Sequence, residues 1–182
     1  MILTIQTMTG AYLEKSLDMV QQVFTEHENE AEGKHVRSLV EEIRTKNSYI
    51  PELEFIAVDE RDEVVGYAMF SGFHLEGKYG DRLLILTPVA VKTELQRRHI
   101  SKRIIEYGFE MARRRGFEAV IVEGNPANYR SRGFVTAASH GILPGETVHL
   151  PHIDCLMVKE LVPGALESIK GHVEYSDYKS LT

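Results

Sequence analysis

Apolar residues recur along the chain with a helical spacing in three long segments. The segments Leu13–Phe24, Val36–Ile43 and Ile100–Ala112 each repeat apolar residues at intervals of three and four, which predicts amphipathic helices. The polar stretch Glu26–Lys34 contains a glycine and is expected to form the loop between the first two helices. Gly116 follows the third segment and is the expected C-terminal cap of that helix.

Other segments are rich in β-branched and aromatic residues and predict strands. They are Ile2–Gln6, Glu54–Asp59, Glu63–Leu75, Arg82–Val91, Phe117–Glu123, Phe134–Ala138, Ile153–Leu161 and Lys170–Tyr175. A short helix is expected at Pro126–Ser131, and a turn-rich loop at Gly141–Gly145. The order up to Leu161, β-α-α-β-β-β-α-β-α-β-β, predicts an α/β (α+β) fold with a mixed sheet flanked by helices.

The strand Arg82–Val91 is apolar almost throughout, which is typical of a central strand buried on both faces. Pro88 lies inside this strand. Because proline cannot donate to a strand ladder, it predicts a bulge or a splayed strand edge at this point.

Composition narrows the classes of function. The chain has 182 residues and a net charge of −6, with 21 Lys and Arg against 27 Asp and Glu. This balance weighs against a nucleic-acid partner, which would require phosphate neutralisation. No apolar run approaches the roughly 20 residues of a membrane span, and Met1–Gln6 does not resemble a signal peptide. The single cysteine, Cys155, favours a reducing compartment, so we expect a cytoplasmic protein without a membrane partner.

Candidate chemistry is concentrated where the buried strand is followed by the third helix. Helix N-termini bind anions through their unpaired N–H groups. Five cations surround this helix start, namely Lys92, Arg97, Arg98, Lys102 and Arg103. The cluster predicts a polyphosphate ligand, with a solvated basic helix face as the alternative. The spacing of His149, His152 and Asp154 could suit a metal, but we expect a loop of surface histidines and no metal site.

Two segments of the chain resemble the GNAT superfamily of N-acetyltransferases. The first is Val89-Ala90-Val91 followed by Gln96–Ser101, which is similar to the family's acetyl-CoA motif, Gln/Arg-x-x-Gly-x-Gly/Ala after an apolar strand. The second is Glu123–Tyr129, closed by Gly133-Phe134. The resemblance is best over residues 82–134 and implies a mostly antiparallel sheet with a splayed parallel strand pair. It also implies one acetyltransferase domain over 1–182, with a cofactor-binding core at 82–134 and C-terminal strands at 139–182 completing the sheet.

The resemblance implies transfer of an acetyl group from acetyl-CoA directly to a primary amine of a small molecule or a peptide, and it leaves a homodimer open. The residues implied in cofactor binding are Val89, Ala90, Val91, Gln96, Arg97, Arg98, His99, Ile100, Ser101, Lys102, Asn125 and Asn128. By analogy with the family, Tyr129 is the acid that protonates the CoA sulfur. Glu123 is our candidate base, and the alternatives are Thr87, His74, His152, Asp154 and ordered water.

His99 and Ser101 depart from the family pattern, which has glycine at the first position and glycine or alanine at the second. A histidine can still offer its N–H group if its backbone is helical, but its side chain must then turn away from the ligand. The departure motivates an alternative function, a non-catalytic acyl-CoA-binding or protein-interaction module with a degenerate pocket.

Overall fold

A computed structural model describes all residues, 1–182. The chain forms two compact units. The first unit contains residues 1–71 and 87–108, and the second contains residues 72–86 and 109–182. The helices are α1 (Leu13–His27), α2 (Glu30–Arg44), α3 (Ile100–Arg114) and the short α4 (Pro126–Tyr129). Short 3-10 turns connect many of the elements. No helix has both the length and the apolar character needed to cross a membrane.

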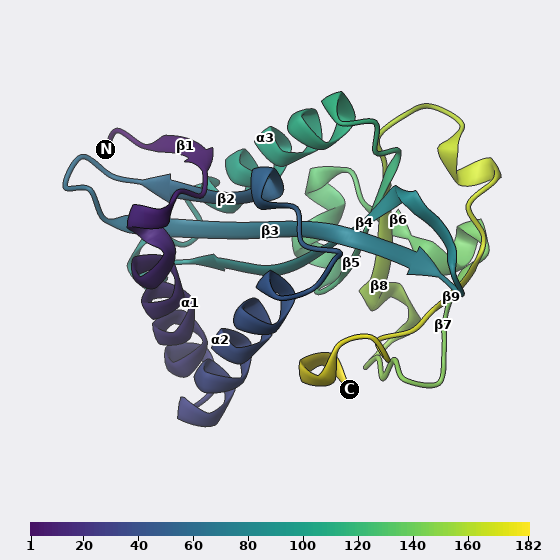
Figure 1. Ribbon diagram of the computed structural model, residues 1–182, viewed down its shortest axis with the longest axis horizontal. Coiled ribbons are helices and arrows are strands. Elements are labelled where there is room, and N and C mark those ends of the chain that lie inside the picture. The colour runs from purple at the N-terminus through teal and green to yellow at the C-terminus, as the bar shows by residue number, and fades with distance from the viewer. The chain divides into compact units, whose positions relative to one another are not determined.

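The strands confirm the predicted mixed sheet. They are β1 (Thr4–Thr7), β2 (Glu54–Val58), β3 (Val64–Leu75), β4 (Lys78–Val91), β5 (Ala119–Glu123), β6 (Val135–Thr136), β7 (Ile142–Pro144), β8 (Leu156–Glu160) and β9 (Gly171–Val173). Seven of them form one sheet in the order β1-β2-β3-β4-β5-β8-β6, and β7 pairs with β9 in a second sheet. Figure 1 shows β3 and β4 as the longest strands.

In the first unit, β1 and β2 pair antiparallel, as do β2 and β3. Helices α1 and α2 lie side by side (Figure 1). The buried residues of each helix recur on one face, as the spacing predicts, because an amphipathic helix buries one apolar stripe. Part of the core of this unit consists of Phe55, Phe70 and Tyr67, which are fully buried.

The expected loop over Glu26–Lys34 was wrong. Helix α1 continues to His27, and α2 begins at Glu30 after Asn29, whose side chain caps the helix by accepting from the amide of Glu32. Gly33 is buried within α2, and a Cβ there would lie 2.0 Å from Thr25 Oγ1 and 2.6 Å from the carbonyl oxygen of Gln21. The glycine therefore marks close contact between two helices and not a turn.

In the second unit, β4 and β5 are the parallel pair, with register from Leu83 opposite Ala119 to Ile85 opposite Ile121. β8 pairs antiparallel with both β5 and β6. The splay at Pro88 stays a prediction. The turn-rich loop expected at Gly141–Gly145 instead contains β7, which pairs parallel with β9, because the long sequence separation of these strands hid their pairing.

Other predicted elements are shorter than expected. The strand Phe134–Ala138 is reduced to β6, and a 3-10 turn follows it. The segment Ile153–Leu161 begins with a 3-10 turn that contains Cys155, so β8 starts only at Leu156. Gly116 caps α3 as predicted, with φ of 90°.

Candidate functional site

The connection between β4 and α3 has an unusual backbone. Arg97 has φ of 62° and His99 has φ of 61°, and both are exposed. α3 begins directly afterwards at Ile100, and the amide of Arg103 donates to the carbonyl oxygen of His99 at 3.1 Å. The first turn of a helix leaves its amides outside the helix ladder, so this end of α3 can bind an anion.

His99 does not meet the condition of a helical backbone, because its φ is left-handed. This conformation costs an L-residue roughly 1–2 kcal/mol and costs glycine almost nothing. The glycine of the family pattern at this position thus matches what the backbone requires, and the histidine occupies the same conformation at an energetic cost. Ser101 differs from it, because it lies in the first turn of α3.

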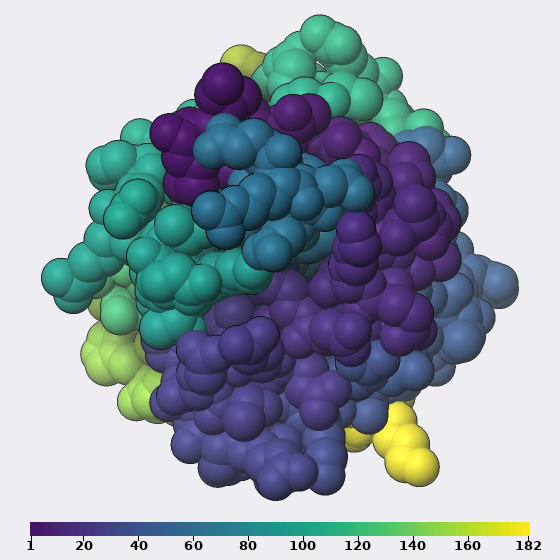
Figure 2. All heavy atoms as spheres, turned by 90° about the vertical axis from the view of Figure 1, so that its left-hand side faces the viewer, coloured from purple at the N-terminus to yellow at the C-terminus, as the bar shows by residue number.

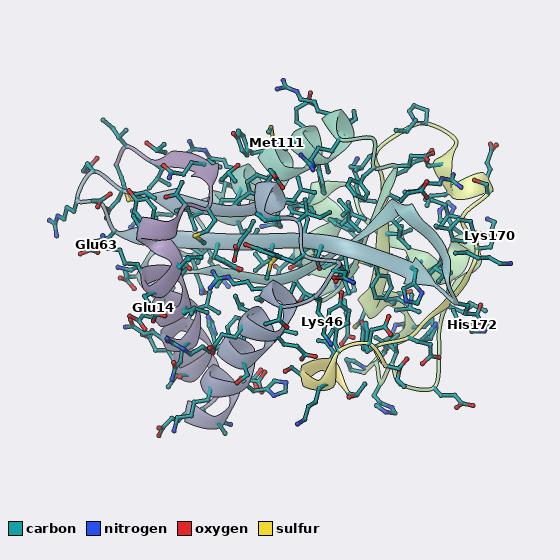
Figure 3. All side chains as sticks on the ribbon, viewed as in Figure 1. Glu14, Lys46, Glu63, Met111, Lys170 and His172 are labelled. Atoms are coloured by element: carbon teal, nitrogen blue, oxygen red, sulfur yellow. The ribbon has the colours of Figure 1, made fainter.

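The candidate cations near this helix start divide into two groups. Arg97, Arg98 and Arg103 are exposed and form no ion pair. Lys92 pairs with Glu63 at 2.8 Å, and Lys102 with Glu106 at 3.8 Å. Glu63 is labelled in Figure 3 at the hairpin that joins β2 and β3. Two arginines of the loop therefore remain available to an anion.

Gln96 is used inside the protein. Its side-chain Nε2 donates to the carbonyl oxygen of Val91 at 3.1 Å and lies 2.8 Å from Nε2 of His27. Of the neighbouring strand residues proposed for the cofactor, Ala90 and Val91 are buried and Val89 is half-buried. Ile100 is also buried. Gln96 thus connects the end of β4 to the end of α1, a role that its place in the motif did not predict.

In the second unit, a pocket of about 300 Å³ lies at the end of β5. Its lining consists of Glu123, Gly124, Asn125, Pro126, Pro151 and Cys155. Glu123 is exposed and accepts a hydrogen bond of 2.8 Å from the hydroxyl of Tyr175, which is 5% exposed. The pKa of Tyr175 is raised by burial and by the nearby Glu123 carboxylate, so this hydroxyl remains a donor.

Tyr129 follows the pocket residues on α4. Its ring lies edge-on to that of Phe134, with centroids 5.5 Å apart, and the Arg132 guanidinium lies 5.8 Å from its centroid. A Cβ on Gly124 would lie only 2.5 Å from this ring, so the glycine permits the approach. Burial raises the pKa of Tyr129, and its hydroxyl is therefore protonated at neutral pH.

The two asparagines of this segment hold the turn. Asn125 caps α4, with its Oδ1 accepting from the amide of Ala127 at 2.9 Å. The backbone carbonyl of Asn128 accepts from Ser131 Oγ at 2.8 Å and from the Arg132 guanidinium. These contacts involve Oδ1 of Asn125 and the backbone of Asn128.

The alternative base candidates have other surroundings. His74 Nε2 lies 2.6 Å from an Asp177 oxygen, and its Nδ1 accepts from the amide of Gly77. His152 Nδ1 accepts from the amide of Asp154 at 3.1 Å. Thr87 lies in β4, half-buried. Among the candidates, Glu123 lines the pocket of the second unit.

Sequence reasoning missed two residues that the structure brings to these places. His27 is 69 positions from Gln96, and Tyr175 is 52 positions from Glu123. Neither has a local sequence signal, because its role depends on a contact between distant segments. The sequence also placed Cys155 within a predicted strand, but the cysteine lies in a 3-10 turn, lines the pocket and is half-buried.

Comparisons with known proteins agree with these features. A family model described as "Acetyltransferase (GNAT) family" matches residues 18–139. The chain is 27% identical over 154 residues to the uncharacterized N-acetyltransferase YhbS of Escherichia coli strain K12, covering 83% of this chain and 84% of that protein.

Two solved structures show the same fold. The crystal structure of YhbS from Escherichia coli in complex with CoA has a TM-score of 0.79 at 24% identity, covering 95% of this chain and 89% of the other. A GNAT family acetyltransferase from Brucella melitensis in complex with acetyl-CoA has a TM-score of 0.68 at 18% identity, covering 100% and 99%.

Proposed function

Because the chain belongs to the acetyltransferase (GNAT) family, we propose that it transfers an acetyl group from acetyl-CoA to a primary amine of a small molecule or a peptide. The observation that carries this proposal is the backbone at Arg97 and His99. Its left-handed turns lead directly into the N-terminus of α3, beside exposed arginines. Similar proteins have been crystallised with CoA and with acetyl-CoA.

We assign the pyrophosphate of acetyl-CoA to the loop and first turn of α3. Its donors are backbone N–H groups between Arg97 and Lys102, together with the Arg97 and Arg98 side chains. Helix N-terminal amides and guanidinium groups both favour phosphate. The end of β4, Val89–Val91, is the proposed partner of the pantetheine amides and of the thioester oxygen. The remaining proposed contact residues are Asn125 and Asn128.

In the proposed reaction, a neutral amine nitrogen attacks the thioester carbonyl carbon, and the carbon–sulfur bond breaks with its electron pair on sulfur. Tyr129 donates its proton to the thiolate and regains one from solvent. Glu123 accepts the proton that the nitrogen loses on forming the amide. A primary amine such as that of lysine has a pKa of about 10.4, so its nitrogen must lose a proton, whereas the thiolate of a thiol with a pKa of about 8.5 must gain one. Positioned groups that accept the first proton and donate the second lower the barrier.

Binding is the first test, because it needs no knowledge of the acceptor. The purified protein is titrated calorimetrically with acetyl-CoA and with CoA at two salt concentrations. Micromolar binding that weakens with salt is expected, since salt screens phosphate contacts. The absence of heat from a folded sample would contradict the proposal.

The second candidate function is a non-catalytic acyl-CoA-binding or interaction module. The observation that favours it is that His99 and Ser101 replace the small residues of the family motif, and that His99 holds a left-handed backbone at an energetic cost. A broad amine panel separates it from the enzyme. Turnover with any amine, lost in Tyr129→Phe, supports acetyl transfer. Binding of acetyl-CoA without turnover on any amine supports the module.

A further inference from the structure

Two hydrogen bonds connect the last turn of α1 to the loop that precedes α3. Thr93 Oγ1 donates to Glu26 Oε2 at 2.6 Å, and Gln96 Nε2 lies 2.8 Å from His27 Nε2. In Figure 2 the teal atoms of the loop region border the purple and indigo atoms of the α1–α2 region. His27 and Glu26 are exposed, so neither contact is needed to fill the core.

The direction of the contact between Gln96 and His27 follows from the third partner. Gln96 Nε2 also lies 3.1 Å from the carbonyl oxygen of Val91, which can only accept. The amide nitrogen, a donor with two hydrogens, must therefore occupy this position. Its second hydrogen points to His27 Nε2, which must accept the hydrogen bond. This nitrogen therefore carries no hydrogen, and the imidazole ring is neutral.

From this geometry we propose that His27 is a positioning residue for the cofactor loop, and that its neutral form supports acetyl-CoA binding. The inference rests on the proposed function, since it assumes that the loop binds the pyrophosphate. Gln96 lies directly before the left-handed Arg97. Holding its side chain at both Val91 and His27 keeps the costly loop conformation in place before the ligand arrives, which reduces the ordering cost of binding.

Protonation of His27 would place an N–H group against the Gln96 amide hydrogens. Acetyl-CoA affinity should therefore fall as His27 becomes charged. The opposite sign is expected if His27 contacted a phosphate, because an imidazolium attracts an anion. The sign of the pH dependence thus separates the two roles.

Charged groups of both signs surround this contact. Glu26 lies beside His27, and its pKa is lowered chiefly by hydrogen bonds from the Thr93 hydroxyl and from the Gln22 side chain. The other charged or titratable groups on α1, α2 and the loop nearby in sequence are Glu28, Glu30, Glu32, Lys34, His35, Lys92, Glu94, Arg97, Arg98 and His99. Glu30 pairs with Lys34 and Lys92 with Glu63, so these are partly compensated.

The test compares three full-length proteins, namely the wild type, His27→Gln and His27→Leu. Glutamine can place an amide oxygen near the position of Nε2 and accept from Gln96 at any pH, whereas leucine cannot accept. Acetyl-CoA dissociation constants are measured by calorimetry from pH 5.5 to 8. Ionisation of the ligand's own phosphates affects all three proteins equally and cancels in their ratios.

At pH 8 we expect His27→Leu to bind about 2- to 10-fold more weakly than the wild type, the usual worth of one hydrogen bond, and His27→Gln to bind like the wild type. At pH 5.5 the wild type should bind about 2- to 10-fold more weakly than His27→Gln. If the wild type and His27→Gln have parallel pH profiles, or if the wild type binds better at low pH than His27→Gln, the inference is wrong while the proposed function stands. If none of the folded proteins binds acetyl-CoA at any pH, the proposed function fails and the inference fails with it.

Discussion

The hydroxyl of Tyr175 donates a hydrogen bond of 2.8 Å to Glu123, the last residue of β5. Tyr175 is buried, follows β9, and lies 52 positions away in sequence. A carboxylate at a strand end can adopt several rotamers, and a fixed donor reduces their number. The contact therefore orients Glu123, the proposed base, at the pocket that it lines.

The first prediction concerns Tyr175→Phe, which keeps the ring and removes the hydroxyl. If Glu123 is the base, turnover should fall about 3- to 10-fold, the equivalent of a hydrogen bond of roughly 1 kcal/mol. Acetyl-CoA affinity should be unchanged. Steady-state kinetics and calorimetry measure both. Glu123→Gln is the matched control and should lose more activity than Tyr175→Phe; equal activity of Glu123→Gln and the wild type would remove Glu123 from the mechanism.

Tyr129→Phe should lower turnover by about 100-fold or more, the usual loss of a general acid, with little change in acetyl-CoA affinity. The ring contacts with Phe134 and Arg132 are retained by phenylalanine, so the fold should be preserved. A proton donor acts in the transition state more than in the ground state. Pre-steady-state and steady-state rates with an active amine are the measurement, and unchanged turnover would exclude Tyr129 as the acid.

His99 and Ser101 should respond to glycine in opposite ways. His99→Gly relieves a left-handed φ and should raise the free energy of unfolding by roughly 0.5–1 kcal/mol after the entropy of the unfolded chain is subtracted. Ser101→Gly lies in α3 and should lower it by at most about 1 kcal/mol. Urea denaturation measures both, and calorimetry should show that neither variant loses acetyl-CoA binding. Destabilisation by His99→Gly would contradict the backbone argument.

Much of the fold could be predicted from the sequence because its signals are local. Apolar spacing located α1, α2 and α3, and β-rich runs located β2, β3 and β5. The same reasoning failed where a contact between distant segments decides the structure. Gly33 was interpreted as a loop residue because glycine is common in turns, but Thr25 and Gln21 of α1 require it within a helix.

In the candidate site, too, local signals could be predicted and contacts between distant segments could not. The motif at Gln96–Ser101 identified the loop by its residue types, yet it could not show that Gln96 contacts His27 or that His99 is left-handed. The first depends on where α1 ends and the second on the backbone path after β4. The contact of Tyr175 with Glu123 could not be predicted for a similar reason, because it depends on the path of the chain after β9.

Gly33→Ala tests the contact between α1 and α2. Alanine favours a helix over glycine by roughly 0.5–1 kcal/mol, so propensity alone predicts stabilisation. The clash with Thr25 Oγ1 and the Gln21 carbonyl should outweigh it and destabilise the protein by about 1–3 kcal/mol. Thermal unfolding measures the change. Gly10→Ala is the control, because a Cβ at Gly10 meets nothing within 4 Å; a higher melting temperature for Gly33→Ala would contradict the close approach.

The last prediction concerns Tyr67, which is fully buried and donates a hydrogen bond of 2.5 Å to the buried Glu54, itself paired with Arg44 at 2.8 Å. Burial, then the Glu54 charge, raise the pKa of Tyr67 well above its ordinary value. Above pH 10 the unfolded chain loses the tyrosine proton while the folded chain keeps it. The unfolded state then binds fewer protons, so the free energy of unfolding falls as pH rises, by about 1.4 kcal/mol per pH unit for one such group. Between pH 9 and 11, where the unfolded tyrosine ionises, urea denaturation should show that the wild type loses about 1.4 kcal/mol more than Tyr67→Phe, which has no proton to lose. Equal losses would mean that Tyr67 ionises as readily in the folded protein as in the unfolded chain.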